Sequence, residues 1–263
     1  LTQTAVTTLG NYVFGNPYRL KSAKLPALTS VGYGTFAHVP DTAMTGVYPL
    51  EEVSFAAGTT DIGSGTFYGT SGYPNLKTVT LPDSVRNSVT AIGDNTFRGC
   101  SALTSLNLGA LTSVGNNAFR GCTNLGKNGN TGFTTAGLTS VGSAAFDGCA
   151  ALTGIDLSAV QTIGARAFRG TALTQADLSE CRAIGDSAFA ETPLQTVNGL
   201  TKLEKLGSYA FAKTGLTGTF TFPATLSSSE RSIGFNPFYG TAITEIVLAG
   251  ENSRYFVRDG VLY

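Results

Sequence analysis

One pattern recurs along the whole chain: an aliphatic residue, a glycine directly after it, and a phenylalanine five residues after the aliphatic. It is clearest in TSVGNNAFRGCTNL at 112–125, TSVGSAAFDGCAAL at 139–152 and TIGARAFRGTAL at 162–173. Successive aliphatic positions lie 21 to 31 residues apart, most often 22. A repeat of this length cannot bury its own apolar face, so it predicts stacked coils that share one continuous core, a solenoid. The ten occurrences are Leu9-Gly10-Phe14, Val31-Gly32-Phe36, Ile62-Gly63-Phe67, Ile92-Gly93-Phe97, Val114-Gly115-Phe119, Val141-Gly142-Phe146, Ile163-Gly164-Phe168, Ile184-Gly185-Phe189, Leu206-Gly207-Phe211 and Ile233-Gly234-Phe238.

The second half of each coil carries an apolar residue, another three positions later and a third two positions after that, as in Leu103, Leu106 and Leu108. The last two alternate with polar neighbours, the period of a strand with one buried face. We call this segment the LxxLxL strand. The segment from the glycine to the phenylalanine is long enough only for a turn or a 3₁₀ turn, and we expect it on the opposite wall. The glycine slot should need positive φ or close backbone approach, and the phenylalanines should stack as an aromatic spine.

Four coils carry insertions, and the glycine- and asparagine-rich one at 126–137 is expected to disrupt the LxxLxL strand of its own coil. The tail at 254–263 reads as two short apolar runs around Asp259 and Gly260, which predicts a tight hairpin. We therefore divide the chain into a solenoid of about ten coils, residues 1–250, and a C-terminal hairpin-like segment, residues 251–263. The second run is short and the repeat starts almost at once, so we expect a piece of a longer protein.

The combined pattern IGxxAFxGCxxLTxLxL resembles the BspA-like class of leucine-rich repeat, found in bacterial and protist surface proteins. The resemblance covers essentially the whole chain and is closest in coils three to seven. It implies a right-handed superhelix with a concave parallel β-sheet of LxxLxL strands, short turns or 3₁₀ segments opposite, and little α-helix. It also implies an extracellular or cell-surface location and a role in binding or adhesion. It carries over no catalytic residues, because the family motif is structural.

Charge and composition exclude several classes of function. The 17 basic and 17 acidic residues cancel, which argues against nucleic acid or a membrane surface as a partner. There is no run of 18 apolar residues, so we predict no membrane insertion. His38 is the single histidine, in an inserted loop, and no phosphate-binding glycine motif is present. We predict a monomer that is not an enzyme and needs no metal or other cofactor.

Three of the four cysteines, Cys100, Cys122 and Cys149, lie three residues after the repeat phenylalanine, where other coils have threonine. A slot shared by cysteine and threonine is a small, semi-buried packing position. We expect free thiols, with a Cys100–Cys122 disulfide between adjacent coils as the alternative.

The polar residue between the last two apolar positions of each LxxLxL strand should point out of the sheet. These residues are the candidate ligand contacts: Ser54, Thr80, Asn107, Asp156, Asp177 and Asn198. Asp156 and Asp177 fall at equivalent positions of neighbouring coils, so we expect them to be adjacent on the sheet. No loop spacing supports a Ca²⁺ site there. The same face could equally be only the solvated side of a sheet.

The competing location for a binding site is the set of loops and turns with tyrosines, namely Tyr48, Tyr68, Tyr73 and Tyr239. Aromatic residues are the usual anchors of an interface, and the LxxLxL face has few. The sequence predicts an extracellular binding or adhesion module for a protein or a glycan. The alternative is a rigid structural spacer in a larger surface protein, with no ligand of its own.

Overall fold

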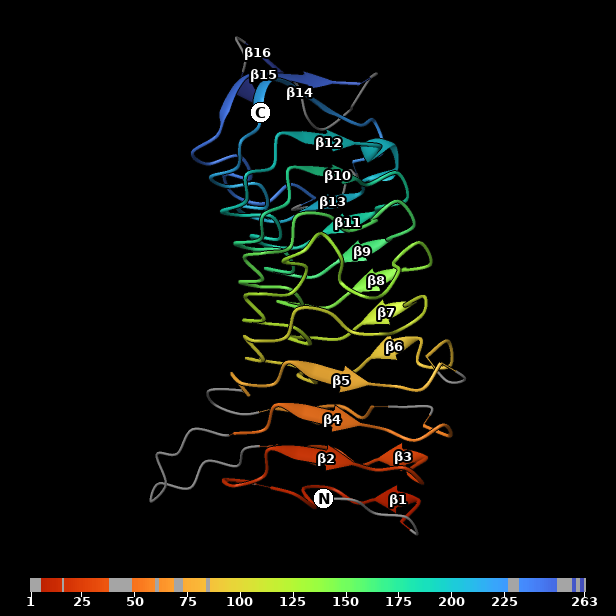
Figure 1. Cartoon of the computed structure of the whole chain (residues 1–263). Helices are drawn as coiled ribbons and strands as arrows, with labels where there is room; N and C mark the ends of the chain where they lie inside the picture. Colours follow the sequence, from red (N-terminus) through yellow and green to blue (C-terminus); the bar gives the residue numbers. More distant parts are fainter. Residues whose placement is uncertain are drawn as a thin grey trace.

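The computed structural model describes residues 6–15, 17–37, 49–59, 62–68, 73–83, 86–226 and 232–249, with the backbone of 257–258 and 261–262. The chain winds into an elongated column with the N-terminus at one end and the C-terminus at the other (Figure 1). Its short strands are stacked in two rows along the column (Figure 1). Among the described residues the only helix is the 3₁₀ turn η1, Leu200–Lys202. The predicted solenoid is confirmed.

The phenylalanine spine is present along the whole column. Ten rings stack in order from Phe14 to Phe238, with 5.2 to 5.8 Å between neighbouring centroids and interplanar angles of 4° to 24°. The eight rings from Phe36 to Phe211 are fully buried. Ten rings at successive levels are separated by nine turns of chain, so each coil contributes one ring to a single core.

The LxxLxL strands form an interrupted parallel wall rather than one sheet. β2 (Ser22–Lys24), β4 (Glu52–Ser54) and β5 (Thr78–Thr80) make one sheet, β10 (Gln175–Asp177) and β12 (Thr196–Asn198) a second, and β14 (Thr217–Phe222) and β15 (Ala242–Leu248) a third. The central residue is buried in β2, β4, β5 and β10, between more exposed neighbours, as the alternation predicts.

The most continuous sheet comes from the residue pairs that precede the repeat glycine, where the sequence analysis predicted no strand. Its six parallel strands follow the order β13-β11-β9-β8-β7-β6. Two residues are too few to show an alternating period, which is why the pattern missed them. The strands are β6 (Ala91–Ile92), β7 (Ser113–Val114), β8 (Ser140–Val141), β9 (Thr162–Ile163), β11 (Ala183–Ile184) and β13 (Lys205–Leu206), and nearer the N-terminus β1 (Thr8–Leu9) pairs with β3 (Ser30–Val31).

Close approach of backbones explains the repeat glycine. A Cβ atom on Gly164 would lie 2.5 Å from the backbone nitrogen of Ser143 in the preceding coil. Of the two predicted reasons, close approach is therefore correct, whereas positive φ holds only at Gly63 among the ten glycines. The left-handed conformation instead falls two residues after the glycine in all ten coils, at Tyr12, Gly34, Gly65, Asn95, Asn117, Ala144, Arg166, Ser187, Tyr209 and Asn236.

The insertion at 126–137 takes the place of a regular strand in its coil. Leu106 N–H donates to the Thr131 carbonyl (2.7 Å), and Leu108 N–H donates to that of Gly132 (2.9 Å). Phe133 is buried, with its ring centroid 5.7 Å from that of Phe119. The predicted disruption of the LxxLxL strand is confirmed, and the insertion also fills the core.

The tail contains a short antiparallel pair, β16 (Val257–Arg258) with β17 (Val261–Leu262), as expected for runs that flank Asp-Gly. The division of the chain at residue 250 stays a prediction.

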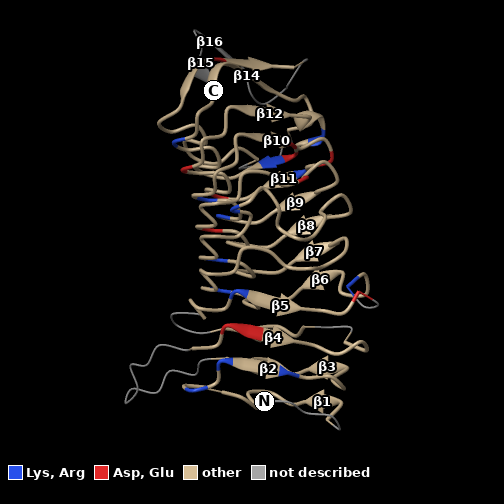
Figure 2. Ribbon diagram, in the orientation of Figure 1, with Lys and Arg blue, Asp and Glu red and all other residues tan. Residues whose placement is uncertain are grey.

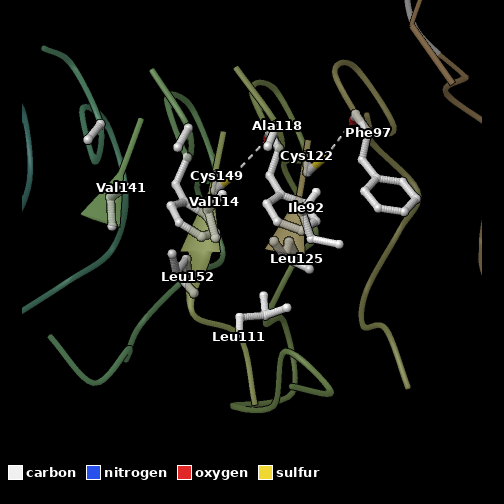
Figure 3. Close-up of a cluster of buried hydrophobic side chains, with 14 of the residues drawn as sticks. Ile92, Phe97, Leu111, Val114, Ala118, Cys122, Leu125, Val141, Cys149 and Leu152 are labelled. Atoms are coloured by element: carbon white, nitrogen blue, oxygen red, sulfur yellow. Dashed lines mark hydrogen bonds between the residues drawn. The ribbon is translucent and has the colours of Figure 1, made fainter. Parts of the chain in front are cut away.

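All four cysteines are free and buried. The thiol of Cys122 donates to the Phe97 carbonyl oxygen at 3.0 Å, and Cys122 and Cys149 lie at successive levels of the core (Figure 3). Where threonine replaces cysteine, as at Thr171, the hydroxyl donates to the carbonyl of the phenylalanine three residues before, Phe168 (2.9 Å). In the coils with cysteine or threonine, the slot therefore holds a small side chain with a hydrogen-bond donor. Burial raises the pKa of the Cys122 thiol well above its usual value.

Candidate functional site

Charged residues are sparse along the column (Figure 2), and several of them pair between neighbouring coils. Lys77 Nζ lies 2.9 Å from Glu51 Oε2, and Lys202 Nζ lies 2.6 Å from Glu180 Oε1. Exposed pairs of this kind contribute little to stability, about 0–1 kcal/mol each. With charged residues sparse and several of them paired, the LxxLxL face presents mainly uncharged hydrogen-bonding groups.

The structure brings four of the six predicted contact residues together as two pairs on the LxxLxL face. Ser54 of β4 is the register partner of Thr80 of β5, and Asp177 of β10 is the partner of Asn198 of β12. Thr80, Asp177 and Asn198 are exposed and Ser54 is half-buried. Paired strands hold partner residues about 5 Å apart, so one ligand can reach both members of a pair.

Asn107 and Asp156 are exposed but lie outside the strands of the described chain, so the row of predicted contact residues is not carried by strands at these two positions. The expected adjacency of Asp156 and Asp177 on one sheet is therefore wrong. The cause is the insertion at 126–137: its Thr131 and Gly132 bond the segment around Asn107, and its Thr135 Oγ1 accepts a hydrogen bond from Asp156 N–H at 3.1 Å.

The two aspartates also have a structural role that the sequence analysis missed. Asp156 Oδ1 accepts hydrogen bonds from the backbone N–H (3.0 Å) and hydroxyl (2.6 Å) of Ser158, and these bonds lower the pKa of the Asp156 carboxyl. Asp177 Oδ1 accepts the same two bonds from Ser179. Each carboxylate thus closes the turn that follows its segment. The Asp-Leu-Ser motif, present in both coils, was the available signal.

A groove of about 530 Å³ lies beside Asn198, between β12 and β14. This volume is within the range of small-ligand sites. Hydroxyls of Thr201, Thr219 and Thr221 line it together with apolar residues that include Leu200 and Phe220. It forms where the β10–β12 sheet ends and the β14–β15 sheet begins, with η1 between them. The LxxLxL pattern did not predict this break between sheets, so the sequence analysis missed the groove.

The predicted tyrosine-bearing loops divide into different cases. Tyr73 is fully buried and its hydroxyl donates to the Phe36 carbonyl, so it is not available to a ligand, and burial raises its pKa. Its place in the core corrects the prediction of an exposed loop residue. Tyr68 is half-buried beneath the Arg98 guanidinium, 5.3 Å from its ring centroid. Tyr239 is 56% exposed.

Two predicted residues, His38 and Tyr48, lie outside the described residues. Across the part of the chain that the structure describes, no three His, Cys, Asp or Glu side chains are grouped to hold a metal ion. Within the same residues, no helix has the length and apolar character needed to cross a membrane.

A column of short parallel strands, a phenylalanine core and a polar outer face together define a leucine-rich repeat solenoid. The family model described as BspA type Leucine rich repeat region matches residues 37–135 and 130–244, in six copies. These ranges cover well over half of the chain, so the chain belongs to the BspA-type leucine-rich repeat family. The predicted family is confirmed.

Three solved bacterial structures are similar to this chain. A leucine-rich repeat protein from Bacteroides ovatus ATCC 8483 is 22% identical with a TM-score of 0.61, over 90% of this chain and 71% of that one, and it shares the fold. A leucine rich cell surface protein from Faecalibacterium prausnitzii A2-165 is 18% identical with a TM-score of 0.48, over 91% and 90% of the two chains. The pneumococcal vaccine antigen PcpA is 17% identical with a TM-score of 0.36, over 97% and 46%. No curated protein sequence matches this one.

Proposed function

We propose that this chain is a non-catalytic binding or adhesion module that acts outside the cell or at its surface. It recognises a protein or a glycan through the LxxLxL face, as a monomer and without a cofactor. Membership of the BspA-type repeat family supports a module without chemistry. The extracellular location follows from the resemblance to bacterial surface repeats.

The observation that carries the proposal is the exposed Asp177–Asn198 pair at the edge of the threonine-lined groove. Among the described residues, the hydrogen bonds to Asp177 go to Oδ1, which leaves Oδ2 available to accept from a ligand. The groove adds the hydroxyls of Thr201 and Thr221, while that of Thr219 donates to Glu245, and it adds apolar lining residues. Small-ligand sites use this mixture for orientation and affinity. Ser54 and Thr80 extend the contact surface towards the N-terminal end, and Asn107 and Asp156 lie between.

The test is binding of the purified chain to an array of extracellular-matrix proteins, mucins and glycans. Asn198→Lys places a long cation at the rim of the groove and should weaken binding at least tenfold. Gln161→Lys, at an exposed residue just before β9, adds the same charge away from the groove and should not change binding. Saturable binding that survives Asn198→Lys unchanged would place the site elsewhere.

The second candidate function is a rigid spacer, and the turn-closing roles of Asp156 and Asp177 favour it, since they give both carboxylates a reason to be present without a ligand. A spacer should bind nothing on the array and should tolerate Asn198→Lys, Thr80→Lys and Gln161→Lys equally. Unchanged thermal unfolding of all three variants is the control that the fold is intact.

A further inference from the structure

We propose a second binding site, for an uncharged carbohydrate, near the C-terminal end of the column. It lies on the wall formed by the turns between the repeat glycine and the repeat phenylalanine, which we call the turn wall. The site consists of three exposed aromatic rings, Tyr209, Phe235 and Tyr239, which we call the C-terminal aromatic cluster, and of the groove beside Phe235. The site lies outside the LxxLxL face, so it goes beyond the function proposed above and does not depend on it.

The three rings form one exposed group. Tyr209 is 37% exposed, Phe235 65% and Tyr239 56%. The ring centroids of Tyr209 and Phe235 are 5.6 Å apart at an interplanar angle of 76°, and those of Tyr209 and Tyr239 are 6.1 Å apart at 87°. Tyr209 therefore stands edge-on between two rings that remain largely open to solvent. Exposed apolar groups gathered in this way mark an interaction site.

The solenoid does not require aromatic residues at these three positions. Phe235 directly follows the repeat glycine, where every other coil except that of Tyr33 has a small or polar residue, such as Ser143 or Asp186. Tyr209 occupies the left-handed slot, with φ 57°, a conformation that suits glycine and asparagine better than a bulky residue. Tyr239 directly follows the spine phenylalanine, where Arg98, Arg120 and Arg169 stand in other coils. Since the fold accepts small or charged residues in each slot, packing does not explain why three large rings meet here.

A groove of about 590 Å³ opens beside Phe235, at the end of the six-stranded sheet. Its lining combines the carboxylates of Asp186 and Glu204 and the ammonium of Lys205 with the Ser208 hydroxyl and the backbone of Gly207 and Gly234. The size suits a small ligand, and the lining combines hydrogen-bonding groups with the aromatic ring of Phe235.

This combination matches the chemistry of a sugar. A pyranose ring has a face of C–H groups that packs on an aromatic ring and an edge of hydroxyls that donate to carboxylates. Arg182 pairs with Glu204, so the two carboxylates at the groove are balanced by Lys205 and Arg182. A groove without net charge does not attract an acidic glycan, which favours an uncharged ligand. A protein partner fits less well, because a stable interface needs about 800 Å² on each side and these nearly perpendicular rings do not form one flat apolar surface.

The N-terminal end of the column supplies a matched control. Tyr12 and Tyr33 occupy the same two slots as Tyr209 and Phe235, with centroids 5.6 Å apart at 75°. The third slot there holds Ala37, which is buried, so this pair lacks the third ring. If any exposed aromatic pair on this wall bound sugars, Tyr12→Ala would weaken binding as much as Phe235→Ala.

The experiment uses the whole chain on a printed array of neutral, sialylated and sulfated oligosaccharides, followed by calorimetric titration with the neutral oligosaccharide that gives the strongest signal. We expect Phe235→Ala and Tyr239→Ala each to weaken its binding at least tenfold. Tyr12→Ala and Gln161→Lys should change it less than twofold. All four variants should keep the thermal unfolding midpoint, because the altered side chains are largely exposed.

Several outcomes would overturn the proposal. They are an array on which no neutral oligosaccharide binds up to millimolar concentration, a preference for sulfated or sialylated glycans, and binding that Phe235→Ala leaves intact. A glycan whose binding is lost in Asn198→Lys but kept in Phe235→Ala belongs to the LxxLxL face, which supports the first site and refutes this one. A glycan whose binding is lost in Phe235→Ala but kept in Asn198→Lys supports this site. The site on the LxxLxL face is then tested only by its own variants.

Discussion

Truncating Phe146 to alanine tests whether the spine stabilises the column. The ring is fully buried and stacks on Phe119 at 5.3 Å and on Phe168 at 5.4 Å. Phe→Ala in a core costs about 3–5 kcal/mol, and the cost is largest where the neighbours cannot collapse into the void. Here they are held in place, because Phe146 N–H donates to the Ala167 carbonyl and Phe119 N–H to the Ala145 carbonyl, both at 2.8 Å. We therefore expect about 4–5 kcal/mol, the upper part of that range.

The assay is equilibrium urea unfolding followed by circular dichroism, with Phe14→Ala as the control. Phe14 is half-buried at the end of the spine and stacks at 5.2 Å on Phe36, so its truncation should cost about 1–2 kcal/mol. Coils interact only with their neighbours, so a central void should also weaken the coupling between the two halves and broaden the transition. A loss below about 1 kcal/mol for Phe146→Ala, or an equal loss for Phe14→Ala, would refute the single stacked core.

Three further predictions follow from individual contacts. Gly164→Ala should lower the free energy of unfolding by about 1–3 kcal/mol in the same urea assay, because its Cβ would meet the backbone of the preceding coil. Gly154→Ala is the control: the space around its Cβ position is open, so the free energy of unfolding should change by no more than about 0.5 kcal/mol. The lowered pKa of Asp156 stabilises the fold at pH values above the carboxyl's usual pKa, and this stabilisation is lost as the pH falls through the folded-state pKa. Ser158→Ala should raise the pKa of Asp156 towards its usual value in an NMR titration. An unchanged pKa would contradict the turn-closing role. Cys122 should resist iodoacetamide at pH 8 in the native chain and react once urea unfolds it, as mass spectrometry can measure; rapid native alkylation would contradict its burial.

The spine and the glycine contacts could be predicted from the sequence because each repeat position has the same structural role in every coil. Recurrence of phenylalanine at a fixed offset implies stacking whatever the local dihedral angles are. The glycine was harder to interpret, because both a left-handed φ and a close approach exclude Cβ. Only the structure separates the two, with close approach at Gly164 and the left-handed residue two positions later at Arg166.

The disruption of the LxxLxL wall at 126–137 was predicted, but its extension to Asn107 and Asp156 could not be, since it depends on where the inserted residues lie in space. An insertion in a solenoid is expected to leave the column as a loop, and residues 126–137 do not, because Phe133 packs beside the spine. This interrupts the row of LxxLxL strands and leaves Asp156 outside them. The aromatic cluster around Phe235 was hidden for a similar reason, since Tyr209 and Phe235 belong to different coils and only the stacking of those coils brings the two rings together.

The repeated coil therefore also indicates where to look for function. A coil fixes the direction of each side chain, so a residue that matches its slot in other coils is explained by stacking. Asp156 and Asp177 match each other and close equivalent turns, which makes a structural reason sufficient for both. Phe235 has an aromatic counterpart in its slot only at Tyr33, packs against one exposed ring, Tyr209, and lines a polar groove. On this argument the C-terminal aromatic cluster is better evidence of a ligand than the polar residues of the LxxLxL face, and Phe235→Ala beside Asn198→Lys decides between the two.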